Sequence, residues 1–167
     1  MARPSHRWSS FMLACLLAGS LSLGDLRGQA ATETVPMERL HVHDVILLPT
    51  VRSKYETTFT KPKTWNVSGA TLEMTFQHSH QLLPNRSWLE VIVNDKALRR
   101  IPLTHANAES TTVKVPVPAG ILEDFNTLSF RVEQHYTDLC EDPLDKSLWT
   151  QVLPSTQLVF NYAPTLP

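Results

Sequence analysis

Two short patterns of methionine and histidine have residue types and spacing that could hold a metal ion. Met37-x-x-x-His41-x-His43 recurs along the chain as Met74-x-x-x-His78-x-His80. Thioether and imidazole groups on one face of a strand are ligands that soft copper sites use. However, the second pair of histidines continues the apolar face of its strand, whereas the first pair lies opposite its apolar neighbours. Two triplets on different faces do not make one site. We therefore expect no metal site and interpret these residues as ordinary strand-end histidines, with a metal carrier as the least favoured alternative.

Paired carboxylates are the other residues that could do chemistry. Glu123-Asp124 and Glu141-Asp142 would have to face each other across a cleft to act as acid and base. Both pairs lie in predicted turns, where solvated acids are common. The chain has no G-x-S-x-G motif, and its five glycines form no phosphate-binding loop. We expect no catalytic residue and no cofactor, and a protein that is not an enzyme.

Two tryptophans are the candidate binding residues. Trp65 lies in a predicted turn, and Trp88 begins a strand on the face opposite Leu89, Val91 and Val93. An exposed aromatic ring offers an apolar surface to the C–H face of a sugar. Both rings are therefore candidate glycan-binding residues, and the alternative is that they only cover strand edges. Trp149 is predicted to belong to the core.

The elements that must position these residues are short strands separated by turn signals. Apolar residues alternate with polar ones in eight or nine segments, and no long helical period is present. The segments are centred on residues 40–48, 55–59, 72–76, 89–93, 101–103, 113–117, 128–132 and 158–162. Asn94-Asp95-Lys96 is a predicted hairpin turn although it lacks the usual glycine, and Pro116 favours an edge strand or a bulge. This pattern predicts an all-β protein, an antiparallel β-sandwich of the jelly-roll type.

The segment from Phe125 to Trp149 joins the clearest strand to a loop. Alternation ends after Tyr136, and residues 137–143 carry the acids and proline of a turn region. Cys140 is the only cysteine outside the N-terminal apolar run. Because free cysteine is among the most buried residue types, we expect Cys140 to be buried, with an intermolecular thiol as the alternative.

The N-terminal residues are typical of a secretory leader. Two arginines precede a short apolar run, and Gly28-Gln29-Ala30 places small residues where a signal peptidase reads. We predict a signal peptide over residues 1–30, a β-sandwich domain over 36–163 and a tail over 164–167, with a retained membrane anchor as the alternative for the leader. The 15 basic and 16 acidic residues form no basic stripe, so nucleic acid is not an expected partner.

Several stretches, in their order and spacing, resemble the first carbohydrate-binding domain of the periplasmic B subunit of bacterial cellulose synthase. They are Leu82-Leu83-Pro84, Ser87-x-Leu89-x-Val91-x-Val93-Asn94, Ile101-Pro102-Leu103, Asp124-Phe125-Asn126-x-Leu128-x-Phe130, Cys140-x-Asp142-Pro143 with Leu148-Trp149, and Ser155-x-x-Leu158. The segment from Cys140 to Trp149 is the most specific of them. The resemblance covers about residues 45–162.

The resemblance implies a non-catalytic periplasmic accessory subunit, associated with the inner membrane, that guides the emerging β-1,4-glucan. Its implied partners are the cellulose synthase catalytic subunit and the glucan chain. Members are often labelled cyclic di-GMP-binding, but we do not expect that ligand, because an exported domain would not meet a cytoplasmic nucleotide and no arginine cluster is visible in the sequence. The family's further domains and C-terminal anchor have no counterpart in these 167 residues. The alternative reading is an independent lectin-like or partner-binding module.

Overall fold

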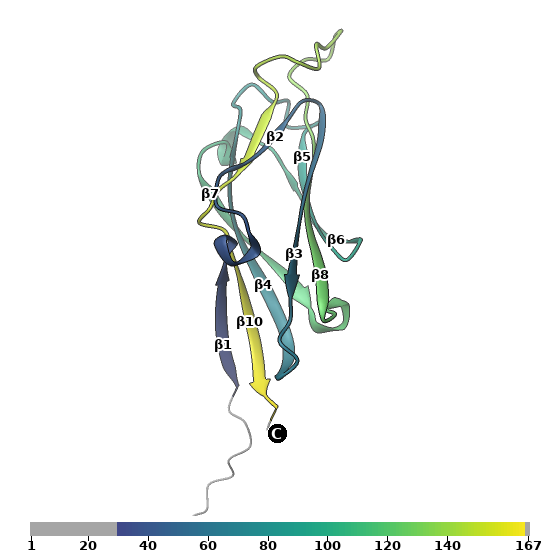
Figure 1. Cartoon of the computed structure of the whole chain (residues 1–167). Helices are drawn as coiled ribbons and strands as arrows, with labels where there is room; N and C mark the ends of the chain where they lie inside the picture. The colour runs from purple at the N-terminus through teal and green to yellow at the C-terminus, as the bar shows by residue number, and fades with distance from the viewer. Residues whose placement is uncertain (1–29, 166–167) are drawn as a thin grey trace, which may run out of the picture.

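The computed structural model describes residues 30–165, which form two antiparallel β-sheets packed face to face. Figure 1 shows the two layers side by side, one containing β1, β10, β4 and β7 and the other β3, β8, β5 and β6. The predicted signal peptide lies outside the described residues, apart from Ala30. Within residues 30–165, no helix is long and apolar enough to cross a membrane.

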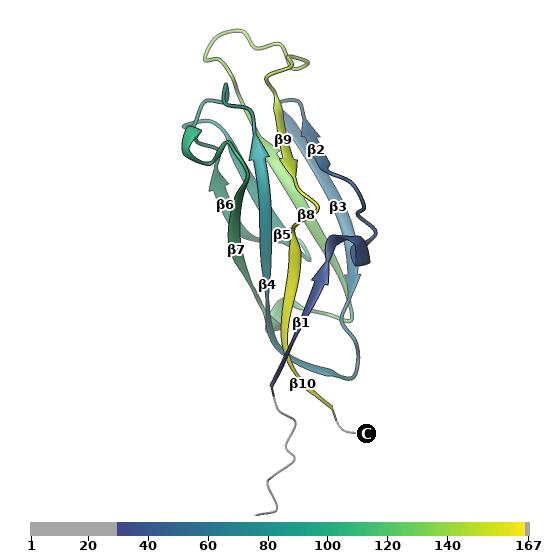
Figure 2. The ribbon, with the colours of Figure 1, turned by 90° about the vertical axis from the view of Figure 1, so that its left-hand side faces the viewer.

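The larger sheet is built around one long strand. Its strands are β1 (Ala31–Pro36), β2 (Ile46–Pro49), β4 (Trp65–His78), β7 (Thr111–Pro118), β9 (Trp149–Val152) and β10 (Gln157–Pro164). One side of β4 pairs with β7. The other side pairs first with β10 and then with β9, and these carry β1 and β2 at the outside. Figure 2 shows this sheet facing the viewer.

The smaller sheet has four strands in the order β3-β8-β5-β6. They are β3 (Arg52–Thr60), β5 (Trp88–Val93), β6 (Lys96–Pro102) and β8 (Phe125–Glu133). Alternation of side chains decides which residues face the core: Leu128, Phe130 and Val132 of β8 are buried, whereas Arg131 between them is exposed. The outer face of β8 therefore carries Thr127, Ser129, Arg131 and Glu133.

The core lies between the two sheets. Buried side chains from β4, β7 and β10 pack with buried side chains from β5 and β8. The largest of them include Phe76, Phe130 and Phe160, which are almost completely inaccessible to solvent. The predicted all-β, jelly-roll-like antiparallel sandwich is confirmed.

The N-terminal part of the domain differs from the prediction. The segment predicted as a strand over residues 40–48 is a strand only from Ile46, and Met37–Leu40 forms a 3-10 turn. This turn buries Met37 and Leu40 on one side, and His41 ends it in the left-handed backbone region with φ of 62°. The strand β1 has no counterpart among the predicted strands, because its alternating residues are mostly Ala, Thr and Glu.

The hairpin between β5 and β6 has a tight two-residue turn. Asn94 and Asp95 both have positive φ, 48° and 60°, as a type I′ turn requires. The Asn94 side chain donates to the carbonyl of Ile121 at 2.7 Å and to Asn126 Oδ1 at 2.8 Å, and it accepts from the Thr127 N–H at 2.8 Å. These bonds fix the turn without the usual glycine, and the predicted hairpin is confirmed.

The loop over residues 137–148 is held by its own hydrogen bonds. The Tyr136 N–H donates to Glu141 at 2.9 Å, the Asp142 N–H donates to the Tyr136 hydroxyl at 3.1 Å, and the Leu144 N–H donates to Asp142 at 2.9 Å. This geometry turns Cys140 to the solvent, so the prediction that Cys140 is buried is wrong. The carboxylates of Glu141 and Asp142 accept backbone N–H groups of this segment, and the Cys140 thiol is not packed into the core.

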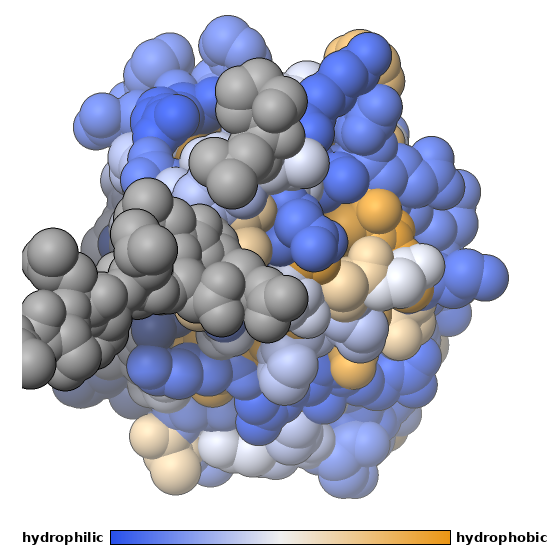
Figure 3. Space-filling view, turned by 90° about the horizontal axis from the view of Figure 1, so that it is seen from below, coloured by the Kyte–Doolittle hydropathy of each residue, from blue (hydrophilic) through white to orange (hydrophobic). Residues whose placement is uncertain are grey.

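The described ends of the chain lie together at one end of the sandwich. Ala31 is paired with Tyr162 across the β1–β10 ladder. In Figure 1 both ends are at the bottom, whereas the loop over residues 137–148 is at the top. Seen from below, the surface is mostly hydrophilic with a small hydrophobic area near its middle (Figure 3).

Candidate functional site

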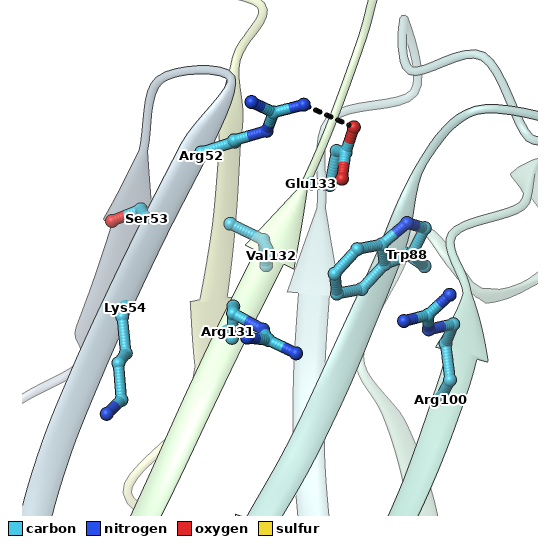
Figure 4. A pocket seen from close by; sticks show the side chains of 8 residues that line it. All are labelled: Arg52, Ser53, Lys54, Trp88, Arg100, Arg131, Val132 and Glu133. Carbon is cyan, nitrogen blue, oxygen red and sulfur yellow. Dashed lines mark hydrogen bonds and ion pairs between the residues drawn. The ribbon is translucent and has the colours of Figure 1, made fainter. Parts of the chain in front are cut away.

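A groove of about 450 Å³ lies on the outer face of the smaller sheet. We call it the Trp88 groove, and its main side chains are Arg52, Lys54, Trp88, Arg100, Arg131 and Glu133. They come from all four strands, and Figure 4 shows Arg131, Trp88 and Arg100 side by side across β8, β5 and β6. The groove lies towards the end of the sandwich opposite the described chain ends.

Strand register brings these residues into two rows. In one row Lys54 is opposite Arg131, which is opposite Glu90, which is opposite Arg100. In the next row Arg52 is opposite Glu133, and Glu133 is opposite Trp88. Directly opposed residues of an antiparallel sheet have side chains on the same face. The residues of both rows therefore share the outer face, although they are far apart in the sequence.

Trp88 is half-buried and lies beneath cationic side chains. The Arg100 guanidinium carbon is 4.1 Å from the centroid of the indole ring, and that of Arg131 is 5.8 Å away. A guanidinium over an indole face is attracted by the ring quadrupole. Such a stacked guanidinium keeps its N–H groups at its edge, where they can bind other acceptors.

Glu90 lies under the groove and holds two of its arginines. Its side chain is only 6% exposed. Arg100 donates to Glu90 Oε1 from Nε and Nη2 at 3.3 and 3.1 Å, and Arg131 Nη2 donates to Glu90 Oε2. One carboxylate therefore orients two guanidinium groups around Trp88, and its own burial is compensated by both.

The rim of the groove has two further ion pairs. Arg52 donates to Glu133 at 3.1 Å, and this bond is the main cause that lowers the pKa of the Glu133 carboxyl below its ordinary value. Lys54 donates to Glu56 at 2.8 Å and, together with the Ser129 hydroxyl, lowers the pKa of Glu56. Both carboxyls are therefore ionised at neutral pH.

The groove corrects the expectation that the chain has no arginine cluster. Arg52, Arg100 and Arg131 line one groove, although about 30 to 50 residues separate them along the chain. Sequence reasoning missed them because each stands singly on its own strand, and only the register of β3, β8, β5 and β6 brings them together. The outward direction of Trp88, by contrast, followed correctly from strand alternation.

Trp65 lies apart from Trp88, at the start of β4 in the other sheet. Its ring is stacked on Tyr162 with centroids 4.0 Å apart, and it meets the edge of Phe160 at 5.7 Å. It also lines a second, smaller pocket of about 200 Å³. The structure therefore does not bring the two candidate tryptophans into one site, and one face of Trp65 is covered by Tyr162.

The methionine and histidine patterns are separated by the fold. Met37 and Met74 are buried in the core, whereas His41, His43 and His80 are exposed. His78 is buried, and its two ring nitrogens lie 2.9 Å from the Ser79 carbonyl and 3.0 Å from Asn107 Oδ1. Within residues 30–165, no three His, Cys, Asp or Glu side chains are grouped to hold a metal ion.

The acidic pairs differ in their surroundings. Glu123 and Asp124 are exposed, as expected for turn acids. Glu141 does not fit the prediction of a solvated acid, because it lies 2.7 Å from His135 Nδ1 and accepts the Tyr136 N–H. His135 also lies 3.6 Å from Glu133, so this pair of contacts links the loop to the rim of the groove. Trp149 is half-buried at the start of β9 rather than fully in the core.

Comparison with known protein families identifies the domain. Residues 30–164 match the family model described as "Cellulose synthase BcsB, first CBM domain". The chain belongs to this family. The BcsB match includes every strand of both sheets, so the fold and the Trp88 groove lie entirely within the matched residues.

Curated relatives carry the name "Cyclic di-GMP-binding protein". One from Pseudomonas fluorescens (strain SBW25) is 30% identical over 175 residues, covering 98% of this chain and 23% of the relative. One from Xanthomonas axonopodis pv. citri (strain 306) is 34% identical over 99 residues, covering 59% of this chain and 13% of the relative. The chain therefore spans less than a quarter of the length of these BcsB-related proteins.

Similar folds occur among solved structures. The CBM36-1 domain of a multidomain xylanase from the hindgut metagenome of Trinervitermes trinervoides has a TM-score of 0.41 at 8% identity, covering 78% of this chain and 96% of that one. TmCBM61 in complex with β-1,4-galactotriose has a TM-score of 0.40 at 8% identity, covering 77% and 81%. Likeness at this level carries no argument about what the BcsB-family domain binds.

Proposed function

We propose that this chain is a non-catalytic accessory module of a cellulose synthase, exported to the periplasm, that binds or guides the emerging β-1,4-glucan. The observation that carries the proposal is the Trp88 groove, an open hollow with an aromatic ring on the outer face of a sheet. The family membership supports it, because the matching model is a domain of cellulose synthase BcsB. Trp88 is the proposed main glycan contact, and Trp65 is a proposed second one.

The groove suits a saccharide on physical grounds. A sugar ring offers C–H groups to an indole and hydroxyl groups to side chains around it. Trp88 supplies the part of its indole that the stacked Arg100 guanidinium leaves uncovered, and Arg100, Arg131 and Glu133 supply hydrogen-bond donors and acceptors at its edge. Because the groove is wide open and its residues sit on rigid strands, a chain could pass along it without a large conformational change.

Substitution of Trp88 tests glucan binding. We expect Trp88→Ala to weaken binding of cellohexaose by about tenfold or more, because the apolar contact surface is lost. The measurement is isothermal titration calorimetry on the chain without its leader. Phe125→Ala is the matched control, because Phe125 is an aromatic residue of β8 that is 78% exposed outside the groove.

Thermal unfolding of each variant separates a folding defect from a binding defect. If Trp88→Ala is folded and binds cellohexaose as tightly as the unchanged chain, the assignment of Trp88 is wrong. The same titration with Trp65→Ala decides whether the second pocket contributes to binding.

Co-purification tests the proposed partner. The mature chain is expected to remain with the solubilised cellulose synthase catalytic subunit from its own inner membrane, in the absence and presence of cello-oligosaccharide. Loss of the synthase with oligosaccharide binding intact would contradict the subunit role and favour the independent lectin-like module.

A further inference from the structure

We infer that the Trp88 groove is selective for an acidic saccharide, a glucan-like chain that carries carboxylate groups. This inference rests on the proposed function, because it assigns the substrate class of the same groove. It concerns the formal charge of the residues around Trp88, which the hydroxyl groups of a neutral glucan can hydrogen-bond but do not neutralise.

The charges around the groove do not balance. Four cationic side chains, Arg52, Lys54, Arg100 and Arg131, are paired with three carboxylates, Glu56, Glu90 and Glu133. The excess arises at Glu90, whose single carboxylate is shared between Arg100 and Arg131. This positive excess stands on a chain with a formal net charge of −1, so the groove is locally distinct from the rest of the molecule.

The cations are accessible to a ligand. The side chains of Arg52, Arg100 and Arg131 are 76%, 57% and 48% exposed, whereas the carboxylate that orients two of them is 6% exposed. Glu90 lies on the same outer face as the two arginines that it pairs with, and it is buried there while their guanidinium groups stay in contact with solvent. A carboxylate arriving from solvent meets these guanidinium donors, and the acid that lines the groove, Glu133, is 29% exposed and already paired with Arg52.

Each guanidinium also keeps donors for a ligand. Within the described residues, Arg131 donates to a side chain only through Nη2, and Arg52 only through Nη2. A guanidinium has five N–H groups in a planar fork that matches a carboxylate. The remaining N–H groups of both arginines are therefore available for a second, bidentate acceptor.

Trp88 and Glu90 hold Arg100 in place before any ligand binds. The indole ring lies under its guanidinium, and Glu90 accepts from two of its nitrogens. A side chain that is already ordered loses little conformational entropy on binding. The row from Lys54 through Arg131 to Arg100 spans three strand spacings, about 14 Å, so more than one carboxylate of the same chain can be engaged.

The test compares two probes that share one sugar backbone and differ only in the groups at C6, which are neutral in one and anionic in the other. Cellohexaose is one probe, and the same oligosaccharide with its primary hydroxyl groups oxidised to carboxylates is the other. We expect the oxidised probe to bind at least about tenfold more tightly at low salt. This advantage should shrink as salt is raised from about 0.05 to about 0.5 M, because screening weakens exposed ion pairs.

Two double variants separate a groove effect from a change in net charge. Arg52→Gln with Lys54→Gln should remove most of the preference for the oxidised probe, measured as the ratio of the two affinities in the same variant. Arg99→Gln with Lys114→Gln removes the same two charges outside the groove, from β6 and β7, and should leave the preference unchanged.

The outcomes distinguish this inference from the proposed function. Equal affinity for both probes, insensitive to salt, would overturn the acidic-saccharide inference and leave glucan binding standing. Binding of neither probe would overturn both. Binding of cyclic di-GMP in the groove, lost in the Arg52 and Lys54 variant and without binding of the oxidised probe, would overturn the inference in favour of an anionic nucleotide. A preference for the oxidised probe that persists in that variant would also overturn it.

Discussion

At the scale of single residues, Glu90 determines how the cationic side of the groove is arranged. It is a buried acid that accepts hydrogen bonds from two half-exposed arginines. The outward direction of the Glu90 side chain is what strand alternation requires, since Glu90 lies between Leu89 and Val91, which face the core. Its partners could not be read from the sequence, because Arg100 and Arg131 belong to other strands and their register was unknown.

Removal of both arginines should show how much free energy the burial of the Glu90 carboxylate costs. We expect Arg100→Ala with Arg131→Ala to lower the free energy of unfolding by about 2 to 3 kcal/mol, because an unpaired carboxylate then remains buried. Adding Glu90→Gln should recover at least about 1 kcal/mol, since the buried charge is gone. Urea unfolding of the three chains measures both steps. A triple variant less stable than the double would show that Glu90 stabilises the fold independently of its arginines.

Cys140 shows where residue statistics failed. The preference of free cysteine for the interior predicted burial, yet the loop keeps its backbone groups satisfied through Glu141 and Asp142, which leaves the thiol in solvent. Local hydrogen bonding therefore determined the position of Cys140 more strongly than its hydrophobicity did.

At the scale of elements, strands with strong alternation were predicted well and those without it were not. The strands β5 and β8 carry valine, leucine or phenylalanine at every second position, and both were recognised. Of β4 only the part around residues 72–76 was recognised, and the prediction that Trp65 lies in a turn is wrong, because β4 begins at Trp65. Of the edge strand or bulge expected from Pro116, the structure shows the edge strand, since within residues 30–165 β7 pairs with β4 alone. By contrast, residues 40–45 were wrongly predicted as strand, because Leu40 and Val42 are buried and have the same parity as Ile46 and Leu48, although Leu40 ends a 3-10 turn.

The hairpin turn offers a test of backbone strain. Asp95 has a φ of 60°, and within the described residues its side chain makes no hydrogen bond that fixes the turn. The side chain of Asn94, by contrast, makes three hydrogen bonds. We expect Asp95→Gly to raise the free energy of unfolding by about 0.5 to 1 kcal/mol, because glycine adopts positive φ without a steric penalty. Thermal unfolding measures the change. Asn94→Gly is the contrasting variant and should be destabilised, and a loss of stability in Asp95→Gly would contradict the reasoning.

At the scale of the whole molecule, β1 completes the edge of the larger sheet. It pairs with β10 over six residues and its Val35 packs against the core. A chain that starts at Met37 should therefore unfold at a temperature at least about 5 °C lower than one that starts at Ala31. It should also self-associate, because the free edge of β10 is a template for another strand. Calorimetry and size-exclusion chromatography test this, and identical behaviour of the two chains would show that β1 is dispensable.

The fold class was predictable because the alternating pattern of the core strands is regular, whereas β1 and the candidate site were not predictable or were so only in part. Alternation showed that Trp88 faces outward, but the groove depends on which strands are neighbours, and that order is set by long-range pairing. The separation of Trp65 from Trp88 has the same origin, because nothing local to either residue indicates which sheet it joins.

Ala31 and Tyr162 face each other across one ladder, so a longer polypeptide could carry this sandwich as an insert with both connections at a single point. Such an attachment acts as a pivot. The module could rotate about this attachment without changing the distance between the chain segments that precede and follow the module. The Trp88 groove lies near the opposite end and would therefore move the farthest. The same proximity makes the domain suited to circular permutation, with new ends placed in the exposed part of the loop around Leu144.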